Sequence, residues 1–387
     1  MSVKRALTRF RGPDEAAAEQ RAWAVVRSAY QERVPARRRA SYRWPALSFA
    51  AVVAAGAVAL SPAGATVGRL ITRALGVEHA APALFSLPAP GRLLVSGPGG
   101  TWTVAADGSA RRLGAWTQAS WSPHGLYLTV ASRDQLAAVN PHGTPQWTLA
   151  RPAISDPRWY PPTGYRVAYL SGDDLRVVAG DGTGDHLLAA SVADVAPAWR
   201  PGHPYELAYV SHEGRIVVRD ADTSRTLWSA NPRSTINELA WSANGQRLLA
   251  LSPTRVRVYT ASGAPSSSAL LPPGSTTVDV ALSPDGHTLA LVLSGSAGDV
   301  VLENIQSPSP ALHRVLSGAG LRQVEWSPDG NWLLVSWPAA NQWVFVRVAG
   351  APRIAAVSRI AQRFAAGTNR GFPQLDGWCC SPQGASG

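Results

Sequence analysis

The stretch Trp326-Ser327-Pro328-Asp329-Gly330, followed by the apolar run Trp332–Ser336, decides the fold because close copies of it recur along the chain. The steps between successive copies are 38, 40, 42, 41 and 44 residues. An even period of about 40 residues indicates repeated structural units. The copies begin at Trp121, Trp159, Trp199, Trp241, Leu282 and Trp326.

The repeated five-residue stretch, which we call the phrase, has a structural interpretation. In Pro328-Asp329-Gly330 the proline suits the second position of a tight turn, and the glycine suits a position with positive φ. The phrase therefore predicts a turn between two antiparallel strands, with the preceding tryptophan packed between repeats. We interpret these residues, including those of a last copy near the C-terminus, as structural rather than catalytic: Trp121, Trp159, Trp199, Trp241, Trp326, Trp378, Gly125, Gly245, Gly286 and Gly330.

Short apolar runs follow each copy, and their lengths predict β-strands rather than buried helices. A unit of four short strands with this period is typical of a β-propeller blade. We therefore predict an all-β propeller domain over residues 91–387. The runs are Leu126–Ser132, Arg166–Leu170, Glu206–Val210, Arg247–Leu251, Thr288–Leu293 and Trp332–Ser336.

The number of blades follows from the two ends of the repeat region. Before the first copy, the runs Arg92–Ser96, Thr101–Ala105 and Ala110–Leu113 predict three strands of a further blade. The C-terminal stretch Trp378–Gly384 resembles the phrase with Cys379 and Cys380 inserted. It would supply the missing strand and close the ring without exposed edges. We predict seven blades, with six as the alternative.

The Trp-Ser-Pro-Asp-Gly phrase followed by an apolar strand resembles the WD-repeat-like β-propeller repeat of TolB-type proteins. The resemblance covers residues 91–384, and the copies at Trp159 and Trp199 depart from it while keeping the tryptophan and a turn. It implies a ring of blades that presents loops for recognition. We expect no TolB-like N-terminal α/β domain before the repeats.

Residues 1–43 predict a basic cytoplasmic tail. The net charge is +11, and this tail holds eleven basic and four acidic residues. Within it, Trp23, Val26 and Tyr30 recur at helical spacing and predict a short amphipathic helix. Three interpretations stay open for this tail, namely a helix lying on the membrane surface, a docking helix for a cytoplasmic partner, and a disordered segment.

Residues 44–68 predict a single transmembrane helix. The stretch has no charged residue and exceeds the roughly 20 residues that cross a bilayer core. Arginines concentrate on its N-terminal side, which places the N-terminus in the cytoplasm. A cleaved signal peptide ending at Ala63-Gly64-Ala65 is the alternative. Residues 69–90 are a connector, and the propeller is expected outside the cytoplasm of a cell-membrane protein.

The sequence shows no catalytic, cofactor or metal motif. There is no cluster of acids or histidines, and the propeller's charge balance gives no support for nucleic-acid binding. Cys379 and Cys380 are the two cysteines; being adjacent, they close an eight-membered ring, pair between chains or stay reduced, and free or intermolecular thiols are the favoured interpretation. We expect no cofactor and no bound metal.

The fold predicts a non-catalytic binding module, with a protein or another extracellular ligand at the propeller face. A sensor that signals through Trp23, Val26 and Tyr30 to a cytoplasmic protein extends this interpretation. Two alternatives stay open. One is a propeller-type enzyme, a hydrolase or lyase, with its site at the central channel. The other is a transmembrane regulator similar to anti-sigma factors, which acts through the tail.

Overall fold

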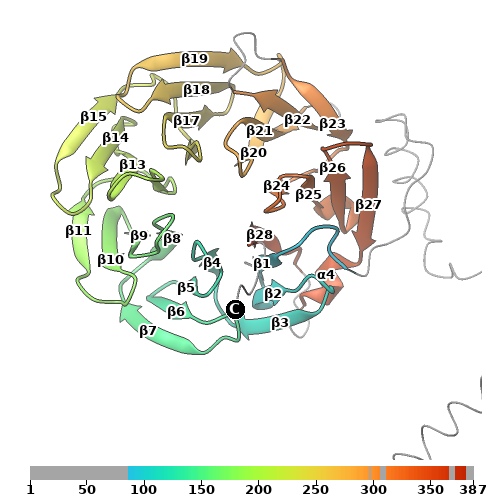
Figure 1. Ribbon diagram of the computed structural model, residues 1–387, viewed down its shortest axis with the longest axis horizontal. Coiled ribbons are helices and arrows are strands. Elements are labelled where there is room, and N and C mark those ends of the chain that lie inside the picture. The colour runs from blue at the N-terminus through green and yellow to red at the C-terminus, as the bar shows by residue number, and fades with distance from the viewer. Residues whose placement is uncertain (1–85, 296–297, 306–310, 366–370, 381–387) are drawn as a thin grey trace, which may run out of the picture. The chain divides into compact units, whose positions relative to one another are not determined.

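The computed structural model describes residues 86–295, 298–305, 311–365 and 371–380. These residues form seven four-stranded antiparallel sheets arranged as the blades of a ring (Figure 1). The prediction of a seven-bladed propeller is confirmed. The predicted tail of residues 1–43 and the predicted membrane span of residues 44–68 lie outside the described residues.

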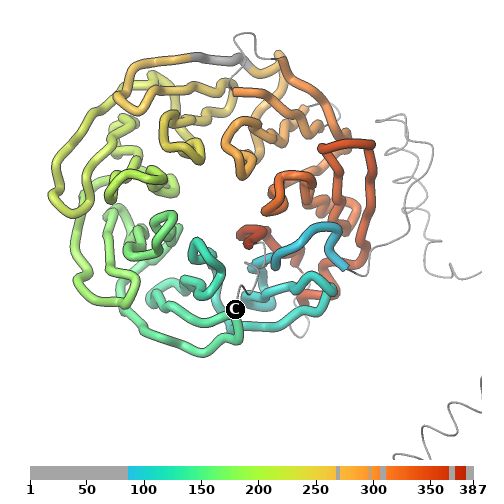
Figure 2. Tube along the Cα trace, viewed as in Figure 1, coloured from blue at the N-terminus to red at the C-terminus, as the bar shows by residue number. Residues whose placement is uncertain are grey.

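Each blade is a meander that runs from the ring centre outward, as the Cα trace in Figure 2 shows. Blade 1 contains β28 (Gln374–Cys379), β1 (Arg92–Gly97), β2 (Gly100–Val104) and β3 (Ala110–Gly114). In blades 2 to 7 the innermost strands are β4 (Gln118–Trp121), β8 (Ile154–Trp159), β12 (Ala198–Trp199), β16 (Glu238–Trp241), β20 (Thr276–Leu282) and β24 (Gln323–Trp326). We call the seven innermost strands, including β28, the inner rim.

The second strands of blades 2 to 7 are β5 (Leu128–Ser132), β9 (Arg166–Ser171), β13 (Glu206–Val210), β17 (Arg247–Ser252), β21 (Thr288–Ser294) and β25 (Trp332–Trp337). The third strands are β6 (Gln135–Val139), β10 (Asp174–Ala179), β14 (Ile216–Asp220), β18 (Arg255–Thr260), β22 (Asp299–Asn304) and β26 (Gln342–Arg347). The outer strands are β7 (Pro145–Ala150), β11 (His186–Ala189), β15 (Thr226–Ala230), β19 (Pro265–Leu270), β23 (His313–Ser317) and β27 (Arg353–Ser358).

The hydrophobic core lies between blades, because each sheet packs face to face on its neighbours. The second strands are buried on both faces, and every residue of β25 is buried. One core cluster joins Ala290 and Val292 of blade 6 to Leu333 and Val335 of blade 7. The outer strand β7 is largely exposed. Two short helices, η1 (Pro338–Ala340) and α4 (Ile360–Arg363), follow strands of blade 7.

The phrase forms the turn between the first and second strands of a blade. In blade 7 the buried Ser327 hydroxyl accepts the Trp332 N–H at 2.9 Å and donates to Asp329 at 2.5 Å. The same serine position accepts an N–H in blades 2, 5 and 6. Gly286 has φ of +72°, and a Cβ there would lie 2.6 Å from the Ala243 nitrogen of the preceding blade. Glycine is therefore required for both the turn and the contact between blades.

The ring closes where β28, from the C-terminus, pairs antiparallel with β1. Trp378 is paired with Leu93 and is buried, with its ring 5.8 Å from that of Phe345. The prediction that the C-terminal stretch completes the N-terminal blade is confirmed.

From the sequence, we interpreted Cys379 and Cys380 as an insertion in the last copy of the phrase. The structure corrects this interpretation. In blade 6, Pro284 lies against Gly330 of the next blade. At the closure, Cys380 holds the equivalent place against Gly125, and the cysteines therefore occupy the Ser-Pro positions of the phrase. They are joined to each other as a disulfide, whereas free or intermolecular thiols were favoured from the sequence.

No helix within the described residues is long and apolar enough to cross a membrane.

Candidate functional site

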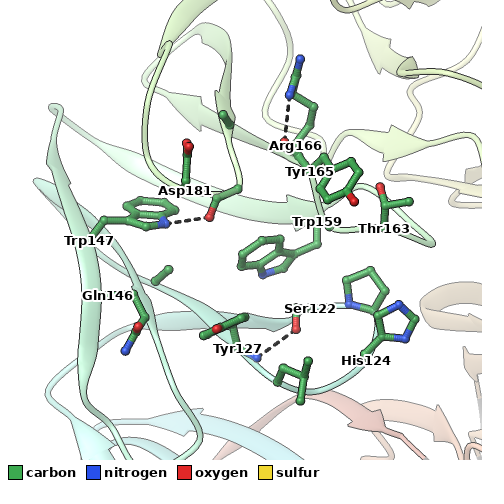
Figure 3. Close-up of a pocket in the computed structure, with 16 residues that line it drawn as sticks. Ser122, His124, Tyr127, Gln146, Trp147, Trp159, Thr163, Tyr165, Arg166 and Asp181 are labelled. Atoms are coloured by element: carbon green, nitrogen blue, oxygen red, sulfur yellow. Dashed lines mark hydrogen bonds between the residues drawn. The ribbon is translucent and has the colours of Figure 1, made fainter.

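A groove of about 690 Å³ lies between blade 2 and blade 3 and is shown in Figure 3. Its walls come from the turn after β4, the strands β6 and β7, the end of β8 and the loop before β9. The turn after β10 completes it. This volume lies within the range of about 300–1,000 Å³ that is usual for ligand sites in proteins. We call this feature the inter-blade groove.

The lining of the inter-blade groove gathers exposed apolar side chains. Leu126 is 64% exposed, Tyr165 is 63% exposed and Tyr127 is 43% exposed, and all three line it. Among the described residues, only Leu187 and Val278 are further exposed large apolar side chains. Three of these five side chains therefore converge on one cavity.

Fixed contacts hold the walls of the groove. The Trp147 indole donates to the Gly180 carbonyl at 2.8 Å, and this bond ties β7 to the turn of the next blade (Figure 3). The Tyr127 N–H donates to the Ser122 hydroxyl at 3.0 Å, which fixes the opposite turn. Trp159 stands between these walls, and its buried indole N–H has no hydrogen-bond partner among the described residues.

Polar and charged groups border the groove. Arg166 pairs with Asp222 at 3.1 Å and lies over the Tyr205 ring at 4.5 Å, so its guanidinium is held in place. Asp181 accepts hydrogen bonds from the side chain and backbone of Thr183, which lower the pKa of its carboxyl. The groove therefore combines an apolar lining with one cation and one anion at its border.

A second candidate site lies at the inner rim. Glu238, Asp279, Glu325 and Asp376 come from four consecutive blades, on β16, β20, β24 and β28. Arg158 comes from β8. The charges of Asp279, Asp376 and Arg158 alter the pKa of Glu325, so these side chains are close enough to interact across blades. The sequence showed no cluster of acids, whereas the ring places these four acids on neighbouring inner strands although they lie 41, 46 and 51 residues apart along the chain.

The protein environment raises the pKa of all four acids. Burial raises the pKa of Glu325 to about 8, with Asp279 and Asp376 adding to the rise and Arg158 opposing it. Burial likewise raises the pKa of Asp279 to about 7 and the pKa of Asp376 to about 7. Burial, followed by the charge of Asp279, raises the pKa of Glu238 well above its usual value.

Two of these acids have partners that join neighbouring strands. Asp279 accepts the Val324 N–H of the next blade at 2.8 Å, and Asp376 accepts the Ser96 hydroxyl. Glu238 and Glu325 accept no hydrogen bond from a described residue. Asp279 and Asp376 therefore connect neighbouring strands, whereas Glu238 and Glu325 make no such contact within the described residues.

One further carboxylate is held by basic side chains. Asp185 accepts hydrogen bonds from Arg151, Arg176 and Tyr169 at 2.6–2.7 Å. Burial raises the pKa of Asp185, but these bonds outweigh it and keep the pKa below its usual value. Within the described residues no group of three or more His, Cys, Asp or Glu side chains could hold a metal ion.

The repeat tryptophans lie between blades. Trp159, Trp199, Trp241, Trp326 and Trp378 are buried, and Trp121 is partly buried. The Trp199 and Trp326 indoles donate to carbonyls of the preceding blade, at 2.9 and 3.0 Å. The glycines Gly125, Gly245, Gly286 and Gly330 all have positive φ. The suggested partner contacts Trp23, Val26 and Tyr30 lie outside the described residues.

Sequence reasoning kept open an enzyme site at the central channel but identified no residue of either candidate site, although part of the signal was present. The four acids occur one to three residues before the tryptophan or leucine of the phrase, within the inner strands of their blades. The groove gave no such signal, because Leu126 was taken as the first residue of a strand run and Tyr165 lies directly before one. Both side chains instead project from turns that precede their strands.

The closed ring of seven blades defines the class of this protein as a seven-bladed β-propeller. No protein-family model and no curated protein sequence matches the chain. Among solved structures, it is similar to the β-propeller domain of Cps50 (Swd1) from Myceliophteria thermophila. The TM-score is 0.50 at 14% identity, over 62% of this chain and 86% of that one.

Hydrazine synthase from Kuenenia stuttgartiensis is also similar, with a TM-score of 0.48 and 14% identity. That match covers 59% of this chain and 76% of the other. At such low identity the likeness to the Cps50 (Swd1) domain shows the fold alone.

Proposed function

We propose that this propeller is a protein-binding module that holds an apolar segment of its partner in the inter-blade groove. The observation that carries the proposal is the convergence of Leu126, Tyr127 and Tyr165 on one cavity. Contiguous exposed apolar surface on a folded protein usually marks an interaction site. Tyrosine, tryptophan and arginine dominate binding energies at protein interfaces, and the groove contains all three types.

The rigidity of the groove favours binding. Its side chains stand on turns that are fixed by the Trp147–Gly180 and Tyr127–Ser122 hydrogen bonds. A preformed site pays less conformational entropy on association, so more of the contact energy appears as affinity. Recognition by loops on a rigid scaffold is the usual way in which propellers are used.

The test replaces Leu126 and Tyr165 together by serine in the full chain. A photo-crosslinking residue at Thr163, at the border of the groove, is used in native membranes with the parent and the variant. We expect the recovered partner to fall at least tenfold in the variant, and to stay at the parental level in the matched control Leu187→Ser. Equal recovery from all three chains would refute the groove as the binding site.

We further propose that the propeller is carried outside the cytoplasm on a single membrane span at residues 44–68. The charge asymmetry around this stretch supports the proposal. Protease added from outside should then remove everything after about residue 80, with the remainder fractionating with membranes. A soluble full-length chain, or a mature N-terminus at Thr66, would contradict it. Loss of a cytoplasmic partner in a Trp23→Ala/Tyr30→Ala variant would support signalling through the tail.

A second candidate function is catalysis at the inner rim, and the four acids favour it. Carboxyls with a raised pKa in a recessed site are typical of general acids and bases. Glu238 and Glu325 accept no hydrogen bond from the described residues and lie near the Arg158 charge. The test is hydrolysis or elimination across a substrate panel by the purified propeller. Turnover that is lost in Glu325→Gln and kept in Leu126→Ser would favour an enzyme over a binding module.

A further inference from the structure

The cysteine pair lies at the joint where the ring closes, between blade 1 and blade 2. Cys379 ends β28 and pairs in register with Arg92 of β1. Its sulfur lies 3.9 Å from the Ser122 carbonyl oxygen, and the Cys380 sulfur lies 3.5 Å from the Pro123 carbonyl oxygen. Both sulfurs therefore contact the turn of blade 2, at the positions where other blades use serine and proline.

This disulfide is poorly suited to a purely stabilising role. A cross-link stabilises a fold mainly by restricting the unfolded chain, and its effect grows with the length of the loop that it closes. Cys379 and Cys380 are adjacent, so their bond closes a ring within a single dipeptide. The hydrogen bonds of β28 with β1 already hold the two chain ends together. Stabilisation of the fold therefore does not explain why a disulfide lies at this position.

A fixed positive charge lies beside the two sulfurs. The Arg92 guanidinium donates to the Gly125 carbonyl at 2.7 Å and lies 5.0 Å from the centre of the Trp121 ring. A methyl group on Gly125 would lie 3.1 Å from the Cys380 sulfur and 3.3 Å from Arg92 Nη2. No carboxylate among the described residues forms an ion pair with Arg92. A neighbouring cation stabilises a thiolate and lowers its pKa.

We propose that Cys379 and Cys380 form a reversible dithiol–disulfide site at the ring closure, which exchanges with small thiols. A small thiolate attacks the Cys380 sulfur, the S–S bond breaks, and Cys379 leaves as a thiolate stabilised by Arg92. A second small thiolate attacks the mixed disulfide and releases Cys380 as a thiolate. Both protein thiolates then take up protons. The protein gains two electrons and two protons, and two small thiols become one small disulfide.

Both redox states are compatible with the native ring. After reduction, each S–H can donate to the carbonyl that its sulfur already contacts, that of Ser122 or that of Pro123. The contact between blades is therefore kept while the covalent ring opens. We expect the reduced and oxidised chains to melt within about 2 °C of each other, because the cross-link restricts the unfolded chain little.

The experiment uses the full chain in its membranes, treated with reduced glutathione at pH 7 without denaturant. The chain has two cysteines, so alkylation followed by mass spectrometry counts them without background. We expect no alkylated thiol before treatment, two after it, and none again after oxidised glutathione. The rate of exchange should fall roughly threefold or more in Arg92→Gln, because the leaving thiolate loses its stabilising charge. Arg92→Lys should restore most of the rate.

Three results would overturn the proposal. The cysteines could react only after denaturation, they could be alkylated at once in the untreated chain, or they could link two chains on a non-reducing gel. An unchanged rate in Arg92→Gln would also overturn it. If that variant fails to fold, the pH dependence of Cys379 alkylation in Cys380→Ser decides instead. A midpoint at or above that of a free cysteine, about 8.5, refutes the role of Arg92.

Discussion

Replacing Trp378 by alanine tests whether the C-terminal strand closes the ring. Trp378 is 7% exposed and packs edge-on against Phe345 across the joint of two blades. Its indole N–H has no hydrogen-bond partner among the described residues, so the substitution removes packing alone. Deleting a buried tryptophan side chain costs about 3–5 kcal/mol in the free energy of unfolding.

The expected shift in melting temperature follows from the size of the domain. Unfolding entropy is about 2.1 cal/mol/K per residue, so a propeller of about 300 residues loses about 1.6 °C per kcal/mol. Trp378→Ala should therefore melt about 5–8 °C below the parent. Calorimetry at two scan rates measures this shift and reveals any irreversible unfolding.

A matched control and a harsher change complete this test. Tyr165→Ala removes an aromatic ring that is 63% exposed, and its melting temperature should stay within about 1 °C of the parent. Truncation after Gly371 removes β28 and exposes the edge of β1, so we expect aggregation or strong destabilisation. If Trp378→Ala and the truncated chain both melt like the parent, the closure by β28 is refuted.

Two further predictions concern the turn and the inner rim. Ser327→Ala should lower the free energy of unfolding by about 1–3 kcal/mol, because the Trp332 N–H loses its acceptor in a buried turn; chemical denaturation should show no such loss for the exposed control Ser262→Ala. The pKa of Glu325 rises from 4.5 to about 8 on folding. Between pH 4.5 and about pH 8 the folded chain therefore holds more protons than the unfolded chain. The free energy of unfolding consequently falls as the pH rises from 4.5 to about 8. Glu325→Gln should therefore melt higher than the parent at pH 8 and near the parental temperature at pH 4, and an equal difference at both pH values would contradict the raised pKa.

The architecture was predictable because a propeller repeats its own signal. Six blades carry a version of the same turn phrase, and six copies at an even period indicate the ring more strongly than any single strand does. The closure of the ring by the C-terminal strand was also predictable, because the stretch at Trp378 repeats the phrase after the last complete blade. The outer strands were harder to predict from the sequence. β7 and β19 have exposed or polar residues, and only the pairing with β6 and β18 determines them.

The sites were less predictable because they depend on contacts between blades. Glu238 and Glu325 are 87 positions apart in the sequence, and only the curvature of the ring brings their charges close enough to interact. The groove similarly needs the turn of one blade beside the loop of the next. Sequence patterns report periodicity within a strand, whereas these sites arise from the packing of whole sheets.

The candidate functional residues lie where blades differ from one another. A residue that several blades share, such as the phrase serine of blades 2, 5, 6 and 7, is explained by the turn that those blades must form. Acids appear at the inner rim of four consecutive blades, and β8 of blade 3 carries Arg158 beside Asp156. Among the seven blades, Cys379 and Cys380 take the place of the Ser-Pro pair at the closure only. Since the ring needs none of these departures to form its turns, they are the positions at which the proposed functions are best tested.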